Sequence, residues 1–153
     1  MLWVAKKADK PFLVKSDCCT TILIAFVFIL DRLSKNFLSD SCFWRFCVSR
    51  AVNDGAAFGI LSGQTLFLIV VGVGVLMLVA MSYRESNRIG RIGLALIAAG
   101  TISNMFDRIF YRYVLDVFTI FGSSSFNLAD MSNLFGAILF ITSLFSSVLP
   151  RKR

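Results

Sequence analysis

The stretch from Asn104 to Asp130, NMFDRIFYRYVLDVFTIFGSSSFNLAD, decides how the rest of the chain is interpreted. It holds three aspartates, two asparagines and two arginines, and it lies between the apolar runs IGLALIAAGTI (Ile92–Ile102) and LFGAILFITSLFSSVL (Leu134–Leu149). Ionisable side chains that border a membrane are energetically expensive and usually functional. We therefore expect this stretch to carry an active site, with the remaining chain serving as scaffold, substrate groove and anchor.

Composition places the chain in a membrane. Of its 153 residues 57% are hydrophobic and only 16% are charged, whereas soluble domains are about half apolar and about a quarter charged. A helix that crosses a bilayer needs about 20 largely apolar residues. Four segments qualify: Thr20–Leu38, Leu61–Tyr83, Ile89–Phe110 and Met131–Leu149. We predict an all-α membrane protein with four transmembrane helices.

The distribution of basic residues predicts the orientation. With a cytoplasmic N-terminus, the inner segments hold ten basic and three acidic residues, while six basic and six acidic residues in the rest of the chain cancel. The entire net charge of +7 then lies inside. We expect both termini in the cytoplasm and every polar motif near the outer face of the membrane. The excess is a topology signal rather than a nucleic-acid footprint, which requires a clustered basic face with aromatic platforms.

The expected organisation is one membrane domain with short ends. Residues 1–19 form a basic cytoplasmic leader without a small-residue cleavage site, so we expect it to be retained. Residues 20–150 form a single four-helix domain, and residues 151–153 form a cytoplasmic tail. The segment 39–63 mixes aromatic and β-branched residues with a turn signal, which predicts short strands in a small outer cap. We expect this cap to dip into lipid through Phe43, Trp44 and Phe46.

The cysteines leave two possibilities open. Cys42 and Cys47 belong to the outer cap and either pair there or remain inert thiols, while Cys18 and Cys19 lie on the cytoplasmic side. The chain has no histidine and no C-x-x-C motif. We therefore expect neither a zinc site nor another metal site.

Two polar motifs precede the central stretch. Asp31 and Lys35 are spaced i, i+4 on one helical face. They either bind substrate and order a site, or neutralise a costly helix end. The run Asn53-Asp54-Gly55 either forms a hairpin turn with positive φ or, with the small residues after it, lets the backbone approach another group closely.

A third motif lies at the start of the central stretch. Asn104, Asp107 and Arg108 share one helical face, with Gly100 one turn earlier, where it allows close helix packing. This motif either orders a site or is an Asp107–Arg108 ion pair that caps the outer helix end.

The last two aspartates suggest a hydrolytic reaction. Asp116 has apolar neighbours on both sides and therefore needs a partner or a raised pKa. Asp130 begins a helix one turn after Asn127, where an anion is stabilised by about 0.3–1 kcal/mol. If the two carboxyl groups face each other, they share one proton. The carboxylate then deprotonates a water that attacks a peptide carbonyl, and the acid protonates the carbonyl oxygen and later the amine. Without histidine, a Ser-His-Asp triad is impossible.

Four motifs in this order resemble a known family. They read Asp31-x-x-x-Lys35, Asn53-x-Gly55-Ala56-Ala57-Phe58, Gly100-x-x-x-Asn104-x-x-Asp107-Arg108, and Val114-x-Asp116 followed by Phe126-Asn127-x-Ala129-Asp130. Over about residues 20–150 the chain resembles the lipoprotein signal peptidases (signal peptidase II), bacterial aspartyl peptidases. Ser103 in place of a second glycine, Val117 in place of a phenylalanine and a short span between the two aspartates depart from the family pattern.

The resemblance implies both a fold and a site. The fold would be four membrane helices with a small β-structured cradle and a short amphipathic helix on the outer, periplasmic face. Asp116 and Asp130 would be the catalytic dyad, with Asp130 as the base in our hypothesis. The residues that would order the site or bind substrate are Asp31, Lys35, Asn53, Gly55, Asn104, Asp107, Arg108 and Asn127.

The implied substrate is a prolipoprotein whose signal peptide precedes a cysteine that already carries diacylglycerol. Cleavage would fall on the N-terminal side of that cysteine. We expect membrane lipid as the surroundings, a monomeric enzyme, and neither a cofactor nor a metal nor a nucleic-acid partner.

Two other functions compete with this prediction. One is a proton-coupled carrier or channel subunit whose carboxylates relay protons, although inverted repeats and proline-broken helices are missing from the sequence. The other is a non-catalytic membrane scaffold in which the aspartates only pair with Arg108 and Arg112.

Overall fold

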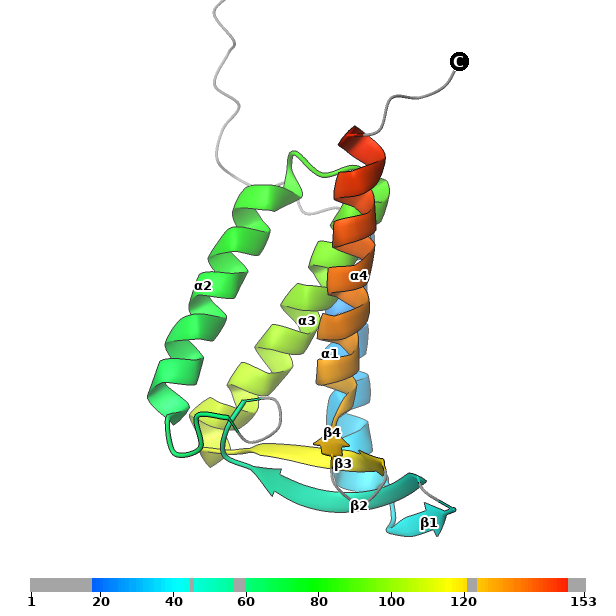
Figure 1. The fold of residues 1–153 in the computed structure, drawn as a ribbon, viewed down its shortest axis with the longest axis vertical. Coiled ribbons are helices and arrows are strands. Elements are labelled where there is room, and N and C mark those ends of the chain that lie inside the picture. The colour runs from blue at the N-terminus through cyan, green and yellow to red at the C-terminus, as the bar shows by residue number, and fades with distance from the viewer. Residues whose placement is uncertain (1–17, 45, 57–59, 121–123, 149–153) are drawn as a thin grey trace, which may run out of the picture.

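Four helices form an elongated bundle with a small sheet across one end (Figure 1). The computed structural model describes residues 18–44, 46–56, 60–120 and 124–148. The helices within these ranges are α1 (Cys18–Phe37), α2 (Thr65–Tyr83), α3 (Arg88–Tyr111) and α4 (Leu128–Val148). The four predicted helices are therefore present, each within a few residues of its expected bounds.

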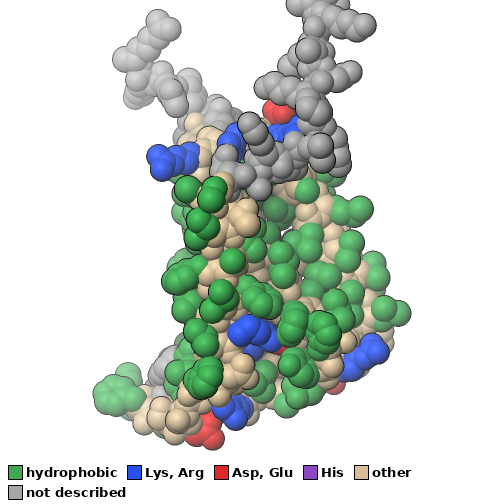
Figure 2. Space-filling view, turned by 180° about the vertical axis from the view of Figure 1, so that it is seen from behind, with side chains coloured by type: hydrophobic (Ala, Val, Ile, Leu, Met, Phe, Trp, Pro, Cys, Tyr) green, Lys and Arg blue, Asp and Glu red, His purple; other side chains and the backbone are tan. Residues whose placement is uncertain are grey.

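Three of these helices are long and apolar enough to cross a membrane, namely Thr65–Tyr83, Arg88–Tyr111 and Leu128–Ser146. Helix α1 has 20 residues, but its second half carries the charged side chains of Asp31, Arg32 and Lys35. Hydrophobic side chains cover the face shown in Figure 2 along the length of the bundle, and most charged side chains lie toward the two ends.

Helix α3 is the central helix and packs against each of the other three. Its buried residues are mainly glycine and alanine, so neighbouring backbones approach closely. An added Cβ at Gly93 would lie 2.7 Å from the carbonyl oxygen of Gly136 on α4. At Gly100 it would lie 2.2 Å from the carbonyl oxygen of Ala129. The predicted role of Gly100 in close helix packing is therefore confirmed.

The sheet has four antiparallel strands in the order β1-β2-β3-β4. Strands β1 (Ser41–Phe43) and β2 (Phe46–Asn53) come from the predicted cap. Strands β3 (Val114–Ile120) and β4 (Ser124–Phe126) come from the segment after α3, where no strand was expected. The short amphipathic helix that the resemblance implies is not seen in the described residues, which contain no helix besides α1–α4. Residues 57–59 of the predicted cap lie outside the described part of the chain.

A left-handed residue turns the chain from α3 into β3. Arg112 has φ 70° and caps α3, and its N–H donates to the carbonyl oxygen of Arg108 at 3.2 Å. The hydroxyl of Thr65, at the start of α2, donates to the carbonyl oxygen of Arg112 at 3.0 Å. This corner directs the following strand, and with it Asp116, across the end of the bundle.

The helix ends next to the predicted inner segments lie together at one end of the bundle (Figure 1). Helix α1 begins, α4 ends, and α2 connects to α3 at the end of the bundle opposite the sheet (Figure 1). The sequence-predicted inner segments follow or precede these helix ends. Most of the basic leader and the whole C-terminal tail lie outside the described residues.

The close approach at Gly100 generates a stability prediction. Gly100→Ala should lower the free energy of unfolding by roughly 1–3 kcal/mol, because the new methyl group overlaps the α4 backbone. The measurement is thermal unfolding of the purified protein in detergent. Gly74→Ala is the matched control, since a Cβ there has no neighbouring heavy atom within 4 Å. Equal melting temperatures for the two variants would contradict the packing argument.

Candidate active site

Asn127 brings Asp116 and Asp130 together. Its side-chain amide donates to Oδ1 of Asp116 at 2.8 Å, and its backbone N–H donates to Oδ2 of Asp130 at 3.2 Å. Asp116 comes from β3 and is 1% exposed, while Asp130 lies half-buried in the first turn of α4. Two carboxyl groups from different elements thus share one fully buried asparagine.

The same asparagine begins helix α4. Oδ1 of Asn127 accepts a hydrogen bond from the backbone N–H of Asp130 at 2.9 Å, while the Asp130 carboxyl accepts from the backbone N–H of Asn127. This reciprocal pair has the geometry of a capping box, which satisfies free N–H groups at a helix start. The capping role expected for Asp130 is confirmed, and it fixes the orientation of the carboxyl group.

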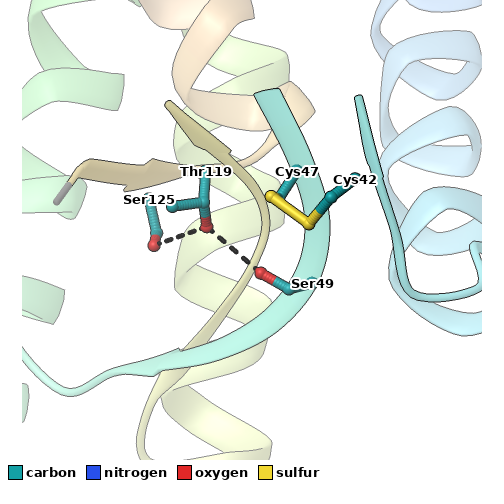
Figure 3. The surroundings of a disulfide bond; sticks show 5 residues. All are labelled: Cys42, Cys47, Ser49, Thr119 and Ser125. Carbon is teal, nitrogen blue, oxygen red and sulfur yellow. Dashed lines mark hydrogen bonds between the residues drawn. A yellow bond between two sulfur atoms is a disulfide. The ribbon is translucent and has the colours of Figure 1, made fainter. Parts of the chain in front are cut away.

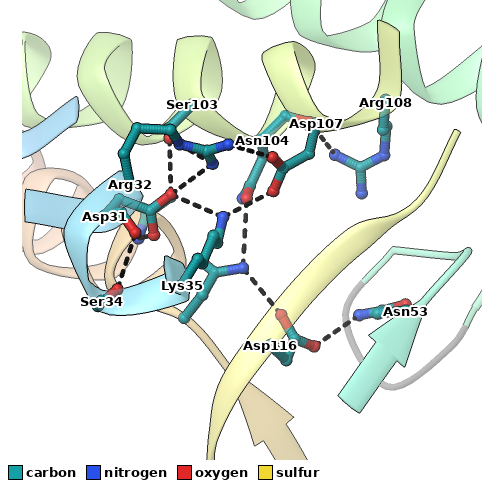
Figure 4. A network of polar contacts seen from close by, with 12 residues as sticks. Asp31, Arg32, Ser34, Lys35, Asn53, Ser103, Asn104, Asp107, Arg108 and Asp116 are labelled. Atoms are coloured by element: carbon teal, nitrogen blue, oxygen red, sulfur yellow. Dashed lines mark hydrogen bonds and ion pairs between the residues drawn. The ribbon is translucent and has the colours of Figure 1, made fainter. Parts of the chain in front are cut away.

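Two further amides complete the surroundings of the carboxyl groups. Asn53 Nδ2 donates to Oδ2 of Asp116 at 3.1 Å (Figure 4), and Asn104 Nδ2 donates to Oδ1 of Asp130 at 2.8 Å. Within the described residues neither carboxyl group forms an ion pair with Arg108 or Arg112. The pairing on which the scaffold hypothesis depends is therefore not observed.

The surroundings of Asp116 favour its neutral form. Burial raises the pKa of the Asp116 carboxyl above its ordinary value, and the nearby charge of Asp130 raises it further. The amides of Asn53 and Asn127 lower this pKa, because they donate hydrogen bonds to the charged form, but they do not cancel the rise. Asp116 therefore retains its proton at a higher pH than an exposed aspartate does.

The loop after β2 is held against α3. The backbone N–H of Gly55 donates to Oδ1 of Asn53 at 3.0 Å, and Nη2 of Arg108 donates to the carbonyl oxygen of Gly55 at 2.8 Å. Gly55 is buried, and its φ is not positive. The predicted turn is therefore present but is closed by the Asn53 side chain without a positive φ at Gly55, and the Gly55 backbone also makes the close approach that was the alternative. Ala57 and Phe58 lie outside the described residues.

A buried ionic cluster lies beside the two carboxyl groups (Figure 4). Lys35 Nζ lies 2.6 Å from Oδ2 of Asp31 and 2.7 Å from Oδ2 of Asp107. The guanidinium of Arg32 pairs with the same two aspartates, at 2.8 Å in the case of Asp31. The Asp31–Lys35 pair is therefore present, but Asp107 pairs with α1 rather than with Arg108, so the predicted Asp107–Arg108 cap is wrong.

The ionic cluster is attached to the start of α4. Oδ1 of Asp31 accepts a hydrogen bond from the backbone N–H of Ala129 at 3.1 Å, and both residues are 0% exposed. Ala129 immediately precedes Asp130. The cluster therefore positions one of the two candidate catalytic carboxyl groups through a single backbone bond.

Two members of this cluster were not predicted as site residues. Arg32 bridges Asp31 and Asp107, and the buried hydroxyl of Ser103 donates to Oδ2 of Asp31 at 2.7 Å. Arg32 is a charge in a membrane-bordering helix, which was a usable signal. Ser103 carries no comparable signal, because isolated serines are common on the packed faces of membrane helices.

Comparison with known proteins gives a consistent family. Residues 23–146 match the model of the family described as signal peptidase (SPase) II. The lipoprotein signal peptidase of Clostridium novyi (strain NT) is 33% identical over 137 residues, which cover 77% of this chain and 91% of the relative. That of Clostridium acetobutylicum is 39% identical over 95 residues, which cover 57% of this chain and 62% of the relative.

Solved structures share the fold. A bacterial membrane enzyme determined in meso at 2.3 Å resolution has a TM-score of 0.80 at 24% identity, over 88% of this chain and 92% of that chain. Another, determined at 1.9 Å, has a TM-score of 0.74 at 24% identity, over 85% and 94% of the two chains. This likeness concerns the fold alone. By the match over residues 23–146 and the identity to its relatives, the chain belongs to the signal peptidase II family.

Proposed function

We propose that this protein is a membrane-embedded aspartyl endopeptidase that removes signal peptides from diacylglyceryl-modified prolipoproteins. It cleaves on the N-terminal side of the lipidated cysteine, and its catalytic dyad is Asp116 and Asp130. The observation that carries the proposal is the pair of hydrogen bonds from Asn127 to both carboxyl groups. Membership of the family supports the substrate class.

In the proposed reaction Asp130 is the base and Asp116 is the acid. The Asp130 carboxylate takes a proton from water as the water oxygen bonds to the scissile carbonyl carbon. Asp116 gives its proton to the carbonyl oxygen. As the carbon–nitrogen bond breaks, Asp130 passes its new proton to the leaving nitrogen and Asp116 regains one from the diol. The raised pKa of Asp116 is compatible with this role, since the acid must be neutral when the water attacks.

Neighbouring polar residues have supporting roles in this proposal. Asn53, Asn104 and Asn127 orient the two carboxyl groups, and Arg108 holds the loop at Gly55 over the site. The ionic cluster of Asp31, Arg32, Lys35 and Asp107 anchors α1 and α3 to the start of α4.

The proposed location is the inner membrane of a bacterium. Helix α1 crosses it as the fourth span, with its charges paired inside the bundle near the outer face. Both termini then lie in the cytoplasm, and the sheet lies at the periplasmic surface. We propose that the enzyme acts there as a monomer surrounded by lipid.

Replacing either carboxyl group of the proposed dyad should strongly slow cleavage. Asp116→Asn and Asp130→Asn should each lower the rate by roughly 10²–10⁴-fold, because each variant loses one proton-transfer group. The measurement is signal-peptide release from a diacylglyceryl-modified prolipoprotein, followed by gel shift with purified enzyme. Asp40→Asn is the matched control, since Asp40 is exposed and distant in sequence from both carboxyl groups.

The outcomes separate the competing functions. Cleavage that survives in one Asn variant would show that the dyad is wrongly paired, with Asp107 as the next candidate. A folded wild-type protein that cleaves nothing, with a substrate accepted by another peptidase of this class, would favour the carrier or scaffold hypothesis.

The pKa of Asp116 generates a pH prediction. Cleavage should fall as the pH rises through the raised pKa of Asp116, because the acid loses its proton. Asn53→Ala removes a hydrogen bond that stabilises the carboxylate, so this pKa should rise further. A hydrogen bond to a charged group stabilises the charged form, so the alkaline limb of the variant should be displaced upward.

The check is a pH–rate profile of kcat/KM for both proteins. Asn36→Ala, a change at an exposed asparagine of α1, should leave the profile at its wild-type position. Displacement of the acid limb instead of the alkaline limb would assign the base role to Asp116 and overturn the proposed division of labour.

A further inference from the structure

We propose that the β1–β2 hairpin is a disulfide-locked membrane contact that inserts Phe43 and Trp44 into the lipid headgroup layer of the outer leaflet. This inference concerns an interaction surface and does not depend on which residues perform the cleavage. Its occupant is the bilayer that surrounds the helices.

The tip of the hairpin presents two large aromatic side chains to the surroundings. Phe43 is 84% exposed and Trp44 is 89% exposed, and Trp44 has φ 55° in the turn between the strands. In Figure 1, β1 projects sideways from the sheet beyond the helices, and Figure 2 shows hydrophobic side chains projecting from the same end of the molecule. Tryptophan is enriched where membrane proteins meet the headgroup layer, because its apolar ring can contact lipid while its N–H remains hydrogen-bonded to water.

A disulfide fixes the arms of this hairpin directly behind the tip. Cys42 and Cys47 face each other in the β1–β2 register and are bonded, with their Cα atoms 4.1 Å apart (Figure 3). The base of the hairpin is joined to the rest of the sheet by hydroxyl contacts. Thr119 on β3 lies 3.3 Å from Ser49 on β2 and 3.0 Å from Ser125 on β4, measured between side-chain oxygens. The disulfide and these hydroxyl contacts therefore hold the hairpin, and with it the aromatic tip, in a fixed position relative to the sheet.

The connection to α1 places the tip at the level of the headgroups. Helix α1 ends at Phe37, which is 76% exposed, and three residues link it to β1. The four Cα–Cα steps from Phe37 to Ser41 span at most about 14 Å, while the headgroup layer on each side of a bilayer is roughly 5–8 Å thick. Arg50 on β2 donates to the carbonyl oxygen of Asn36 at 3.0 Å and limits how far the hairpin can swing from the helix end.

The size of the tip favours lipid over a protein partner. A stable protein interface buries about 800 Å² on each side, whereas two aromatic side chains supply about 300–500 Å². The exposed apolar residues of α1, among them Phe26, Ile29 and Leu33, form a lipid-facing surface that leads toward the hairpin. The tip thus extends the lipid-facing surface of the helices rather than forming a separate patch.

The contact has a mechanical consequence for the site. Strand β2 continues from the hairpin and pairs with β3, with Ala51 opposite Asp116. A hairpin held at the headgroup level therefore holds the strand that carries Asp116 at a defined depth above the hydrocarbon layer.

Tryptophan fluorescence tests this proposal directly, because the chain has two tryptophans, Trp3 and Trp44. Trp3→Phe leaves Trp44 as the single reporter in the full-length protein. The variant is reconstituted into phosphatidylethanolamine–phosphatidylglycerol vesicles that contain lipids brominated at either a shallow or a deep acyl position. We expect blue-shifted emission, stronger quenching by the shallow bromines, and weak quenching by aqueous acrylamide. Full acrylamide quenching without bromolipid quenching would overturn the proposal.

The role of the disulfide is tested in the same vesicles. Reduction with a water-soluble phosphine, or the combined change Cys42→Ser and Cys47→Ser, should weaken bromolipid quenching and increase acrylamide quenching. The matched control changes Cys18 and Cys19, which are exposed free thiols, to serine and should alter neither. Helical circular dichroism verifies that each variant is folded. Unchanged bromolipid quenching after confirmed reduction would show that the disulfide does not lock the contact.

Discussion

The structure depends on the burial of opposite charges between α1 and α3. Asp31 is completely buried, and its carboxylate is satisfied by Arg32, Lys35, Ser103 and the backbone of Ala129. A buried ion pair that loses one partner typically costs 3–5 kcal/mol, because the remaining charge has no access to water. The arrangement therefore tolerates little variation in the distance or rotation of the two helices. It contributes specificity of packing more than net stability, and it fixes the start of α4 against α1 and α3.

Small residues and charges act together in this arrangement. The glycines of α3 bring α4 close enough for the backbone of Ala129 to reach Asp31. A helix with larger side chains at Gly93 and Gly100 would hold α4 farther away and leave that carboxylate oxygen unsatisfied in a medium without water. Dispersion and shape therefore set the helix separation, and electrostatics set the register. Both the close packing against Gly100 and the hydrogen bond to Asp31 involve Ala129, the residue before Asp130.

The parts of the fold that could be predicted are those that depend on the hydrophobicity of long stretches of sequence. The helices follow from apolar runs of membrane length, and the polar motifs followed from their position at the ends of these runs. The strand that carries Asp116 was not predicted, although Val-Leu-Asp-Val-Phe-Thr-Ile is rich in β-branched and aromatic residues. Asp116 interrupts the apolar run and weakens its strand signal. The predicted ion pair of Asp107 with Arg108 was also wrong. Spacing along one helix favours Arg108, but the observed partners Lys35 and Arg32 come from a different helix.

Asn127 couples the formation of helix α4 to the pairing of the two carboxyl groups. Its backbone and side chain begin helix α4, and the same side chain holds Asp116. The geometry that unites the two carboxyl groups therefore exists only when the final helix has formed and docked. The 126 residues that precede Asn127 contain Asp116 but neither Asn127 nor Asp130, so they cannot form this arrangement by themselves. For the proposed dyad, this means that a chain in which α4 has not yet docked holds no assembled pair of carboxyl groups.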